Sequence, residues 1–530
     1  MKRILLLFVC FGIIACHKDL DQNPIDPDVV SEVDVFEDVN TAKAALAKIY
    51  ASFAVTGQQG PAGDADVQGF DEGYSQYTRQ LWTLNELTTD HGIVAWGDPG
   101  LPNMHAMSWD ANNGWTAGMY YRLGQVVSFA NSFIANAAPL ASDAEVQSFI
   151  AEAKFLRAYA YYNLLDWYAN VPIVTEISAE LPVQSNRTEI YNYIESELLA
   201  LSNELKEPKA NEYGRVDKAA AWALLSRLYL NAEVYIGESK YTESMDYADR
   251  VISSAYSLNL ADGNSNGSAY DELFLADNNT NGAQDEAIFV VQFDGNGTQT
   301  WGGATFLVHA SIGGNMDAAA YGVNGGWGGI RATKALVEKF AYSITATDGD
   351  GHPTSWSDPR AMFYTDGQSY EIENVSTFTD GYAVTKFKNI DSSGNQGSDS
   401  SGTHCDTDIH IIRLAEMYLN YAEAAVRSGA NSGRALELIN DLRRRAGAPL
   451  AQASEINTQF VMDERSRELY WEGTRRTDLI RDGKFVTSDY LWPFKAGAQG
   501  GAATDDYRRI YPIPADVLLV NTNLQQNPNY

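Results

Sequence analysis

The stretch EVQSFIAEAKFLRAYAYYNLLDWYANVP, residues 145–172, constrains the fold of this chain more than any other part of the sequence. Its apolar residues recur every three or four positions, as Phe149, Leu156 and Leu164 illustrate. This spacing predicts one long helix with a buried stripe, and Pro172 is expected to end it. The sequence therefore predicts a mainly α-helical protein built around this helix.

Other helical patterns occur in pairs that short loops divide. The pairs are about 34 residues long and rich in small residues, which is typical of tetratricopeptide-like helical hairpins. Gly429 and Gly447 stand where helix C-caps are expected. The expected helices cover residues 41–53, 145–172, about 188–206, 216–235, 241–255, 411–429, 432–447 and about 457–472.

Two parts of the chain are irregular instead. Residues 57–115 and 256–410 are rich in Gly, Asn, Asp, Ser and Thr, with short strands such as EAIFVVQF, 286–293. Irregular segments on a rigid helical frame are where binding residues tend to lie. We therefore divide the chain into a signal peptide 1–15, an N-terminal tether 16–40, a helical core 41–255 with ligand loop 57–115, a loop-rich binding region 256–410, and a C-terminal part 411–530 that completes the core with a hairpin, a helix and a tail.

The N-terminus predicts export. Lys2 and Arg3 precede a short apolar run that ends at Ala15, directly before Cys16. The run is too short to span a bilayer as a mature helix and reads as a signal peptide. The residues before Cys16 resemble a bacterial lipobox, so we expect Cys16 to be lipidated. The acidic residues after it resemble the export signal of cell-surface lipoproteins of Bacteroidetes. An ordinary secretory signal with an incidental cysteine is the alternative.

Charge and motifs narrow the class of function. The net charge of −31 argues against a nucleic-acid binder and against electrostatic docking on anionic lipid. The sequence contains no H-E-x-x-H, no P-loop and no Rossmann glycine pattern. His404 beside Cys405 could suggest a nucleophile, but a small buried thiol is the favoured interpretation. We therefore expect a protein that is not an enzyme.

Three tryptophans are flanked by glycine and lie in the irregular parts: Trp96, Trp301 and Trp327. An exposed indole offers a flat apolar face and one N–H donor, on which the C–H face of a sugar ring can pack. Flanking glycines are expected to keep that face uncovered. The alternative is that the indoles only pack the insertion. Candidate polar contacts for sugar hydroxyls are Asp71, Arg79 and Asn85.

One short segment suggests calcium. DNNTNG, 277–282, places Asp277 and Asn279 like the first half of a calcium-binding loop. The glutamate expected at the twelfth position is missing, since Ile288 stands there. A solvated turn is the alternative. A structural calcium ion is therefore an open expectation, and no other cofactor is expected.

At this point the residues resemble the SusD/RagB family of outer-membrane nutrient-binding lipoproteins, over essentially the whole chain. The resemblance rests on the lipobox and on AEAKFLRAYAYYNLLDWYANVPIV, GRVDKAAAWALLSRLYLNA, IIRLAEMYLNYAEAA, ERSRELYWEGTRRTDLIRDGKF and YPIPADVLLVNTNLQQNPNY. It implies a tetratricopeptide-like core with a loop-rich ligand region. It also implies a non-catalytic protein that covers a SusC-like TonB-dependent transporter at the cell surface and delivers oligosaccharide to it.

Three segments resemble the starch-binding members more closely: GFDEGYSQYTRQLWTLNELTTD…AWGDPG, WGGATFLVH and NGGWGGIRA. In those members an arc of aromatic side chains cradles an α-glucan, and the resemblance assigns this role to the three tryptophans here. The founding member has a Tyr where Trp301 stands in this chain. The resemblance also assigns polar contacts to Asp71 and Arg79. Pro99 replaces a polar Asn, which puts the fine specificity in doubt.

We therefore expect an α-glucan, starch or malto-oligosaccharide, as the ligand. The alternatives are a β-glucan such as laminarin, a structural lid without its own sugar site, and a glycoside hydrolase with an unrecognised acid pair.

The arginine-rich motif RELYWEGTRRTDLIR also needs an interpretation. Its charged residues are spaced to form ion pairs and caps on and just past one helix, which indicates a structural role. A contact with the transporter is the alternative. The residues are Arg467, Glu468, Glu472, Arg475 and Asp478.

Overall fold

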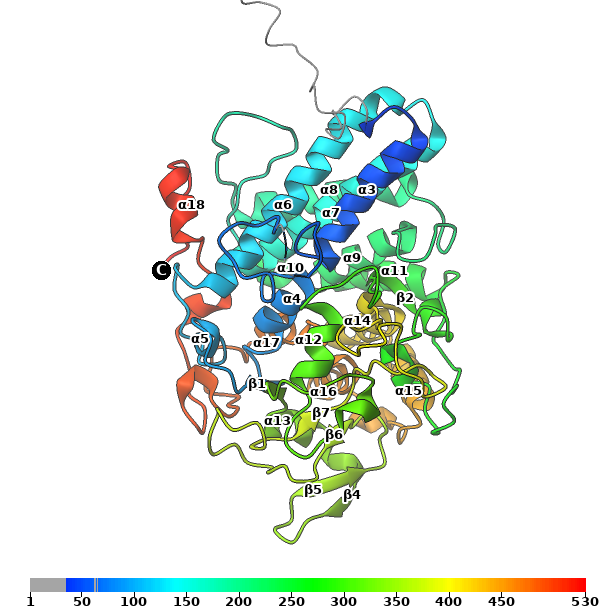
Figure 1. Cartoon of the computed structure of the whole chain (residues 1–530), viewed down its shortest axis with the longest axis vertical. Coiled ribbons are helices and arrows are strands. Elements are labelled where there is room, and N and C mark those ends of the chain that lie inside the picture. Colours follow the sequence, from blue (N-terminus) through cyan, green and yellow to red (C-terminus); the bar gives the residue numbers. More distant parts are fainter. Residues whose placement is uncertain (1–34, 62, 64) are drawn as a thin grey trace, which may run out of the picture.

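The computed structural model of the chain describes residues 35–61, 63 and 65–530 (Figure 1). The expected signal peptide, Cys16 and most of the tether lie outside the described residues. Within them, none of the helices is both long and apolar enough to pass through a membrane. The helices are α3 (Val39–Ala54), α4 (Tyr77–Asn85), α5 (Leu101–His105), α6 (Gly114–Ala137), α7 (Ala144–Tyr168), α8 (Arg187–Glu204), α9 (Lys218–Leu230), α10 (Ala232–Ile236), α11 (Tyr241–Ile252), α12 (Gly303–Ala310), α13 (Lys334–Val337), α14 (Leu414–Ser428), α15 (Ser432–Ala446), α16 (Thr458–Leu469), α17 (Arg475–Arg481) and α18 (Ala515–Val520).

The long helix predicted first is present as α7. The Asp143 carboxylate caps it by accepting the amide N–H of Glu145 at 2.8 Å. The helix ends at Tyr168, because Ala169 takes a positive φ of 61° and breaks the helical path before Pro172 is reached. Nearly every residue of its second half is buried, so α7 runs through the core of the molecule.

The helix α6 packs along α7 and was not predicted (Figure 1). Asn113 caps its start, with its side-chain oxygen accepting the amide N–H groups of Trp115 and Thr116. Its interior glycines, Gly118 and Gly124, weaken the helical signal of the sequence. Its first two residues, Gly114 and Trp115, fall at the end of the stretch 57–115 that was predicted to be irregular.

The expected hairpins form: α7 packs on α8, α9 on α11, and α14 on α15. The C-caps at Gly429 and Gly447 are confirmed, each with φ of 72° in the left-handed region. Two boundaries differ from the prediction. Asn231 separates α9 from α10, and the first residues of the 411–429 helix are extended as the end of strand β8. The mainly α-helical, tetratricopeptide-like fold with short strands is confirmed.

The strands are short and pair only in twos. Sheet order is β1-β3, β2-β8, β4-β5 and β6-β7, all antiparallel. Apart from β1, they lie in or at the end of the loop-rich part of the chain, and the β4–β5 hairpin projects at one end of the molecule (Figure 1). The strands are β1 (Ile93–Val94), β2 (Ala287–Val291), β3 (Ile330–Arg331), β4 (Ile344–Thr347), β5 (Pro353–Trp356), β6 (Phe363–Tyr364), β7 (Ala383–Val384) and β8 (Ile409–Arg413).

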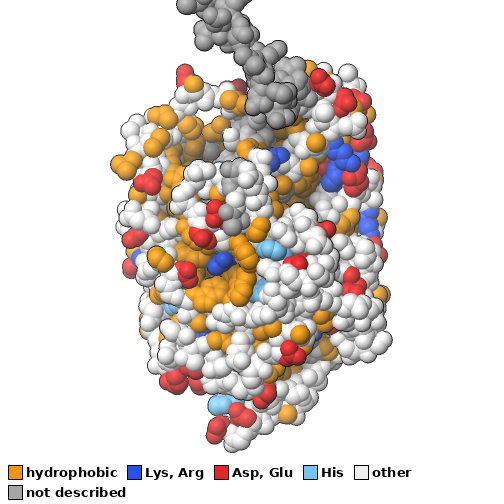
Figure 2. Space-filling model, viewed as in Figure 1, with side chains coloured by type: hydrophobic (Ala, Val, Ile, Leu, Met, Phe, Trp, Pro, Cys, Tyr) orange, Lys and Arg blue, Asp and Glu red, His pale blue; other side chains and the backbone are white. Residues whose placement is uncertain are grey.

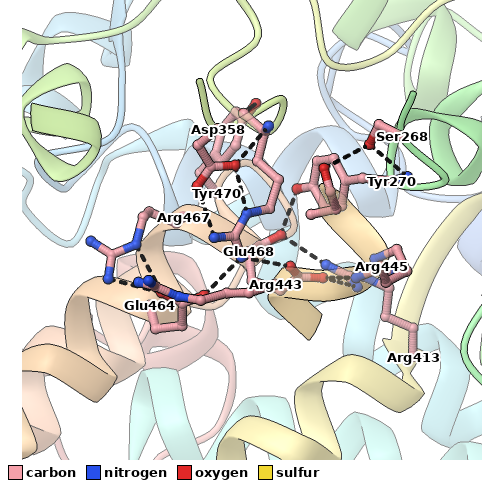
Figure 3. A network of polar contacts seen from close by, with 12 residues as sticks. Ser268, Tyr270, Asp358, Arg413, Arg443, Arg445, Glu464, Arg467, Glu468 and Tyr470 are labelled. Carbon is pink, nitrogen blue, oxygen red and sulfur yellow. Dashed lines mark hydrogen bonds and ion pairs between the residues drawn. The ribbon is translucent and has the colours of Figure 1, made fainter. Parts of the chain in front are cut away.

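A buried network of charges joins the loop-rich part to the C-terminal helices (Figure 3). Glu468 of α16 lies 3.1 Å from Arg360 and 2.7 Å from Arg413, and it also pairs with Arg445 of α15. Burial alone would raise the pKa of Glu468, but these three guanidinium groups outweigh it and lower the pKa to about 2. The carboxylate therefore stays charged inside the protein and holds three segments together.

The arginine-rich motif belongs to this interior, as its structural interpretation predicted. Arg467 pairs with Glu464 at 2.8 Å, and Arg475 pairs with Asp90 at 2.6 Å. Glu472 and Asp478 are likewise paired, with Arg413 and with Arg465 and Arg481. Most of these partners come from distant parts of the chain rather than from the next turn. The motif is therefore a structural hub and not an exposed surface.

Candidate functional site

The tryptophans Trp96 and Trp327 come together because the short sheet β1-β3 joins their loops. Ile93 pairs with Arg331 and Val94 with Ile330 in an antiparallel register. The segment after β1, which carries Trp96, therefore lies beside the segment before β3, which carries Trp327. The indole N–H of Trp96 donates to the carbonyl oxygen of Trp327 at 3.2 Å. Two loops more than two hundred residues apart are thus held in one register.

All three indoles form one cluster. The ring centroids of Trp96 and Trp327 lie 6.4 Å apart with planes tilted by 45°, and those of Trp301 and Trp327 lie 6.2 Å apart with a tilt of 54°. Each of the three side chains is only partly buried. Because the planes are tilted, the exposed faces form a curved surface rather than a flat one. The structure thus brings together the three tryptophans predicted to bind a ligand, and their role in binding stays a prediction.

The glycines near Trp96 and Trp327 have two roles, close packing and open space. A Cβ at Gly329 would lie 2.3 Å from Cζ2 of Trp96, and a Cβ at Gly326 would lie 2.2 Å from the carbonyl oxygen of Ile312. These two glycines let the indole and the loop pack closely against neighbouring chain. Gly97 and Gly325 have no atom within 4 Å of a built Cβ and only leave space open.

Two histidines pack against the tryptophans, and the sequence analysis did not predict them. The His309 ring stacks on the Trp327 indole, with centroids 4.7 Å apart and an angle of 16°. Its Nδ1 lies 2.6 Å from the carbonyl oxygen of Gly325, and its Nε2 lies 3.0 Å from that of Thr403. Since His309 covers one face of Trp327, a ligand can stack only on the opposite face. His404 likewise packs on Trp301, at 4.9 Å.

Arg79 lies among the aromatic rings. Its guanidinium is 4.8 Å from the Phe306 ring centroid and 5.6 Å from those of Trp96 and Trp115. Nη1 donates to the carbonyl oxygen of Gly73 at 2.7 Å. Burial lowers the pKa of Arg79 to about 10, with Asp98 and Asp71 opposing the shift, so the group remains a cation at neutral pH.

Asp71 and Arg79 both hydrogen-bond to the backbone of Gly73. The Asp71 carboxylate accepts the amide N–H of Gly73 at 2.8 Å. A Cβ at Gly73 would lie 2.7 Å from Oδ1 of Asp71, 3.4 Å from Nη1 of Arg79 and 3.7 Å from Cβ of Trp301. Asp71, Arg79 and Trp301 therefore converge on one point, and Asp71 is exposed there.

Asn85 does not belong to this site, which corrects the prediction. Its side-chain amide donates to the carbonyl oxygen of Gly473 at 2.7 Å, and its side-chain oxygen accepts the indole N–H of Trp167 at 2.9 Å. The residue is buried inside the helical core. Its position at the end of α4 turns it inward, whereas Arg79 lies nearer the start of that helix.

The calcium ligands expected at Asp277 and Asn279 stay a prediction. The Asp277 carboxylate accepts the Ser392 hydroxyl at 2.6 Å and the Asn281 amide at 3.1 Å. Asn279 is partly buried.

The buried-thiol interpretation of Cys405 is confirmed, because its side chain is buried and burial raises its pKa strongly.

The face of the molecule seen in Figure 2 carries a hollow lined with hydrophobic side chains. A basic side chain lies within it and histidine lies beside it. This composition matches that of the cluster just described. A curved aromatic surface with one cation and one carboxylate can stack on flat apolar faces and hydrogen-bond to hydroxyl groups at their edges.

Comparison with known proteins shows to which family the chain is similar. The family described as "SusD family" matches residues 360–530, and the one described as "Starch-binding associating with outer membrane" matches residues 68–230. The chain is 35% identical to the starch-binding protein SusD of Bacteroides thetaiotaomicron, over 99% of this chain and 98% of that protein. It is 23% identical to SusD-like protein P2 of Formosa agariphila over the whole of both chains.

Solved structures share the fold. A SusD superfamily protein from Bacteroides thetaiotaomicron aligns with a TM-score of 0.68 at 21% identity, covering 92% of this chain and 99% of that one. Surface glycan-binding protein A from Bacteroides fluxus aligns with a TM-score of 0.68 at 20% identity, covering 93% and 100%.

Proposed function

The chain belongs to the SusD family, and from that premise we propose that it is a surface lipoprotein that captures an α-glucan. Starch or malto-oligosaccharide is the proposed ligand, and a SusC-like TonB-dependent transporter of the outer membrane is the proposed recipient. The lipid on Cys16 would tether it to the surface of a Bacteroidetes-type bacterium. The name of the 35% identical relative, a starch-binding protein, supports this assignment.

The observation that carries the proposal is the cluster of Trp96, Trp301 and Trp327 around Arg79. The tilted indoles give sugar rings a curved path, which suits the bend of an α-linked glucan better than a straight chain. Each platform contributes about 1–2 kcal/mol by analogy with other ring contacts. Arg79 and Asp71 supply a donor and an acceptor for hydroxyl groups. The partial exposure of all three indoles speaks against a lid without its own sugar site.

A β-glucan such as laminarin is the second candidate, and Pro99 favours it. Pro99 is exposed beside Trp96 and has no N–H to donate. Its carbonyl oxygen is already bonded to the Trp115 indole N–H at 3.2 Å. The backbone of Pro99 thus offers no donor, and its acceptor is already engaged, which changes which hydroxyl groups can be bound there.

Calorimetry on the chain from residue 17 onward tests the proposal, with maltoheptaose and a laminarin oligosaccharide titrated separately. We expect binding of maltoheptaose, with no reducing sugar released from starch by the same preparation. In Trp96→Ala the binding should be lost or greatly weakened while the far-UV circular dichroism is unchanged. Binding of laminarin alone would replace the ligand, and sugar release would make the protein a hydrolase.

Delivery to the transporter needs a separate test. We expect the lipidated chain to co-purify from membranes with an outer-membrane transporter of the TonB-dependent class. A chain that is recovered alone after mild detergent extraction, with its transporter present in the same membranes, would argue against this part of the proposal.

A further inference from the structure

The loop DGNSNGSAYDE, residues 262–272, carries oxygen-bearing side chains at alternate positions. Asp262, Asn264 and Asn266 occupy the first, third and fifth places, and Gly267 occupies the sixth. This is the opening of a calcium-binding loop, in which those three side chains face the ion and glycine allows the sharp turn. The acidic residues that follow stand at the tenth and eleventh places, as Asp271 and Glu272, rather than at the twelfth. The pattern alone is weak evidence.

The backbone of this loop takes the shape that the pattern requires. Gly267 has a φ of 91°, which a residue with a side chain rarely adopts. The Asp262 carboxylate accepts the amide N–H of Asn266 at 3.0 Å and that of Gly267 at 2.9 Å. The loop is thereby folded around its own first side chain.

The side chains of the loop converge on one carboxylate. The amide groups of Asn264 and Asn266 lie 2.8 Å and 2.6 Å from Oδ2 of Asp271. An Asn side chain carries a donor nitrogen and an acceptor oxygen that exchange places by a half-turn of the amide. The side-chain oxygens of Asn264 and Asn266 accept the amide N–H groups of Asn266 and Ser268 in this structure. A half-turn of each amide would exchange those two bonds for contacts with a cation beside Asp271.

Asp271 is the observation that points to a ligand. Only 5% of the residue is exposed, and its Oδ1 has no hydrogen-bond partner among the described residues. Its neighbour Glu272 is fully buried, and the Glu272 carboxylate accepts the amide N–H of Asn264 at 2.8 Å. Glu286 close by pairs with Arg413 and Arg445. In the part of the chain that the structure describes, no such basic partner pairs with Asp262, Asp271 or Glu272.

A buried carboxylate without a counter-charge is costly, and a bound cation removes that cost. We propose that residues 262–271 bind a calcium ion through the side chains of Asp262, Asn264, Asn266 and Asp271. All four donors are oxygen atoms on an irregular loop, which suits Ca²⁺ rather than Zn²⁺ or Cu²⁺, and the loop lacks the rigid octahedral cage that Mg²⁺ demands.

The ion would fix a loop that touches two helices. Directly after the glycine, the Ser268 hydroxyl donates to the carbonyl oxygen of Ala446 at the end of α15, at 3.2 Å. The Tyr270 hydroxyl donates to the carbonyl oxygen of Glu468 in α16 at 2.6 Å (Figure 3). Calcium binding should therefore stabilise the folded chain at the buried charge network, away from the tryptophan cluster.

The test is calorimetry on the purified protein after removal of metal by a chelator, with CaCl₂ and MgCl₂ titrated separately. We expect one Ca²⁺ that depends on loop 262–271, much weaker binding of Mg²⁺, and a rise in the melting temperature with Ca²⁺. Asp271→Asn and Asp262→Asn should each weaken Ca²⁺ binding by at least roughly tenfold, since even outer contacts of a metal site cost that much. Asp262 is exposed, so its variant keeps the test valid if Asp271→Asn fails to fold.

Two matched controls separate this loop from other acidic groups. Asp348→Asn removes a carboxylate from the exposed group of Asp348, Asp350 and His352 in the β4–β5 turn, and Asp277→Asn removes the carboxylate of the next segment. Asp348→Asn should bind Ca²⁺ like the unmodified protein, and Asp277→Asn should keep the ion of loop 262–271 and lose only an ion held at the separate site expected at Asp277 and Asn279. Absence of Ca²⁺ binding, binding that survives both loop substitutions, or binding lost only in a control variant would each overturn the proposal.

Discussion

Replacing Gly329 by alanine tests the aromatic cluster without removing any indole. The added Cβ would lie 2.3 Å from Cζ2, 2.5 Å from Cε2 and 2.8 Å from Cη2 of Trp96, whereas ordinary contact begins at 3.4 Å. The indole must therefore move by about 1 Å. That movement also breaks the hydrogen bond from Trp96 to the carbonyl of Trp327.

We expect the displaced indole to lose its contribution to the binding free energy of the glucan, about 1–2 kcal/mol. This corresponds to roughly five- to thirtyfold weaker binding of maltoheptaose, or of the laminarin oligosaccharide if that is the ligand, by calorimetry. Overpacking should also lower the free energy of unfolding by about 1–3 kcal/mol, measured with urea.

Gly325→Ala is the matched control in the same loop. Its added Cβ meets no atom within 4 Å, so binding and stability should stay unchanged. If Gly329→Ala binds the glucan as tightly as the unmodified protein, Trp96 is not a platform. If both variants lose affinity equally, the effect comes from the loop backbone and not from the indole.

Three further predictions concern the cluster and the core. Trp327→Ala should weaken glucan binding by a similar or larger factor in calorimetry, whereas Trp356→Ala, which removes a partly buried indole from strand β5, should leave it unchanged. Burial raises the pKa of Asp408 to about 7, above its usual 3.8. The stability that the protonated carboxyl gives at low pH is therefore lost as the pH rises. Asp408→Asn cannot ionise, so its melting temperature should rise relative to that of the unmodified protein between about pH 4 and pH 7. Arg413→Met leaves buried carboxylates unpaired and should cost about 3–5 kcal/mol in urea unfolding, while Arg444→Met on the exposed side of α15 should stay within about 0.5 kcal/mol.

The sequence predicted the helices whose apolar residues repeat regularly. The helix α7 and the hairpin of α14 and α15 have such a repeat, and their caps follow known residue preferences. The helix α6 was missed because Gly118 and Gly124 interrupt its pattern, whereas its packing on α7, α3 and α4 stabilises it there. Periodicity reports the burial of one helix face and says nothing of a neighbour that has not yet been identified.

The tryptophan cluster was predictable in its aromatic residues but not in the residues that support them. A tryptophan among turn residues is conspicuous in any sequence, so all three indoles were found. His309 was not, because a histidine in an apolar helix gives no sign of the ring that will stack on it. Asn85 was assigned to the rim because it is near the cluster in sequence, but the helical turn between Arg79 and Asn85 points it into the core.

The indoles arrive on three separate loops, one after β1, one before α12 and one before β3. None of them is carried in the interior of a helix. A change in one loop can thus exchange a single sugar contact while the helical frame, its caps and its buried charges remain as they are. Such a surface can be adapted to a new polymer in small steps, each of which leaves a folded protein on which selection can act.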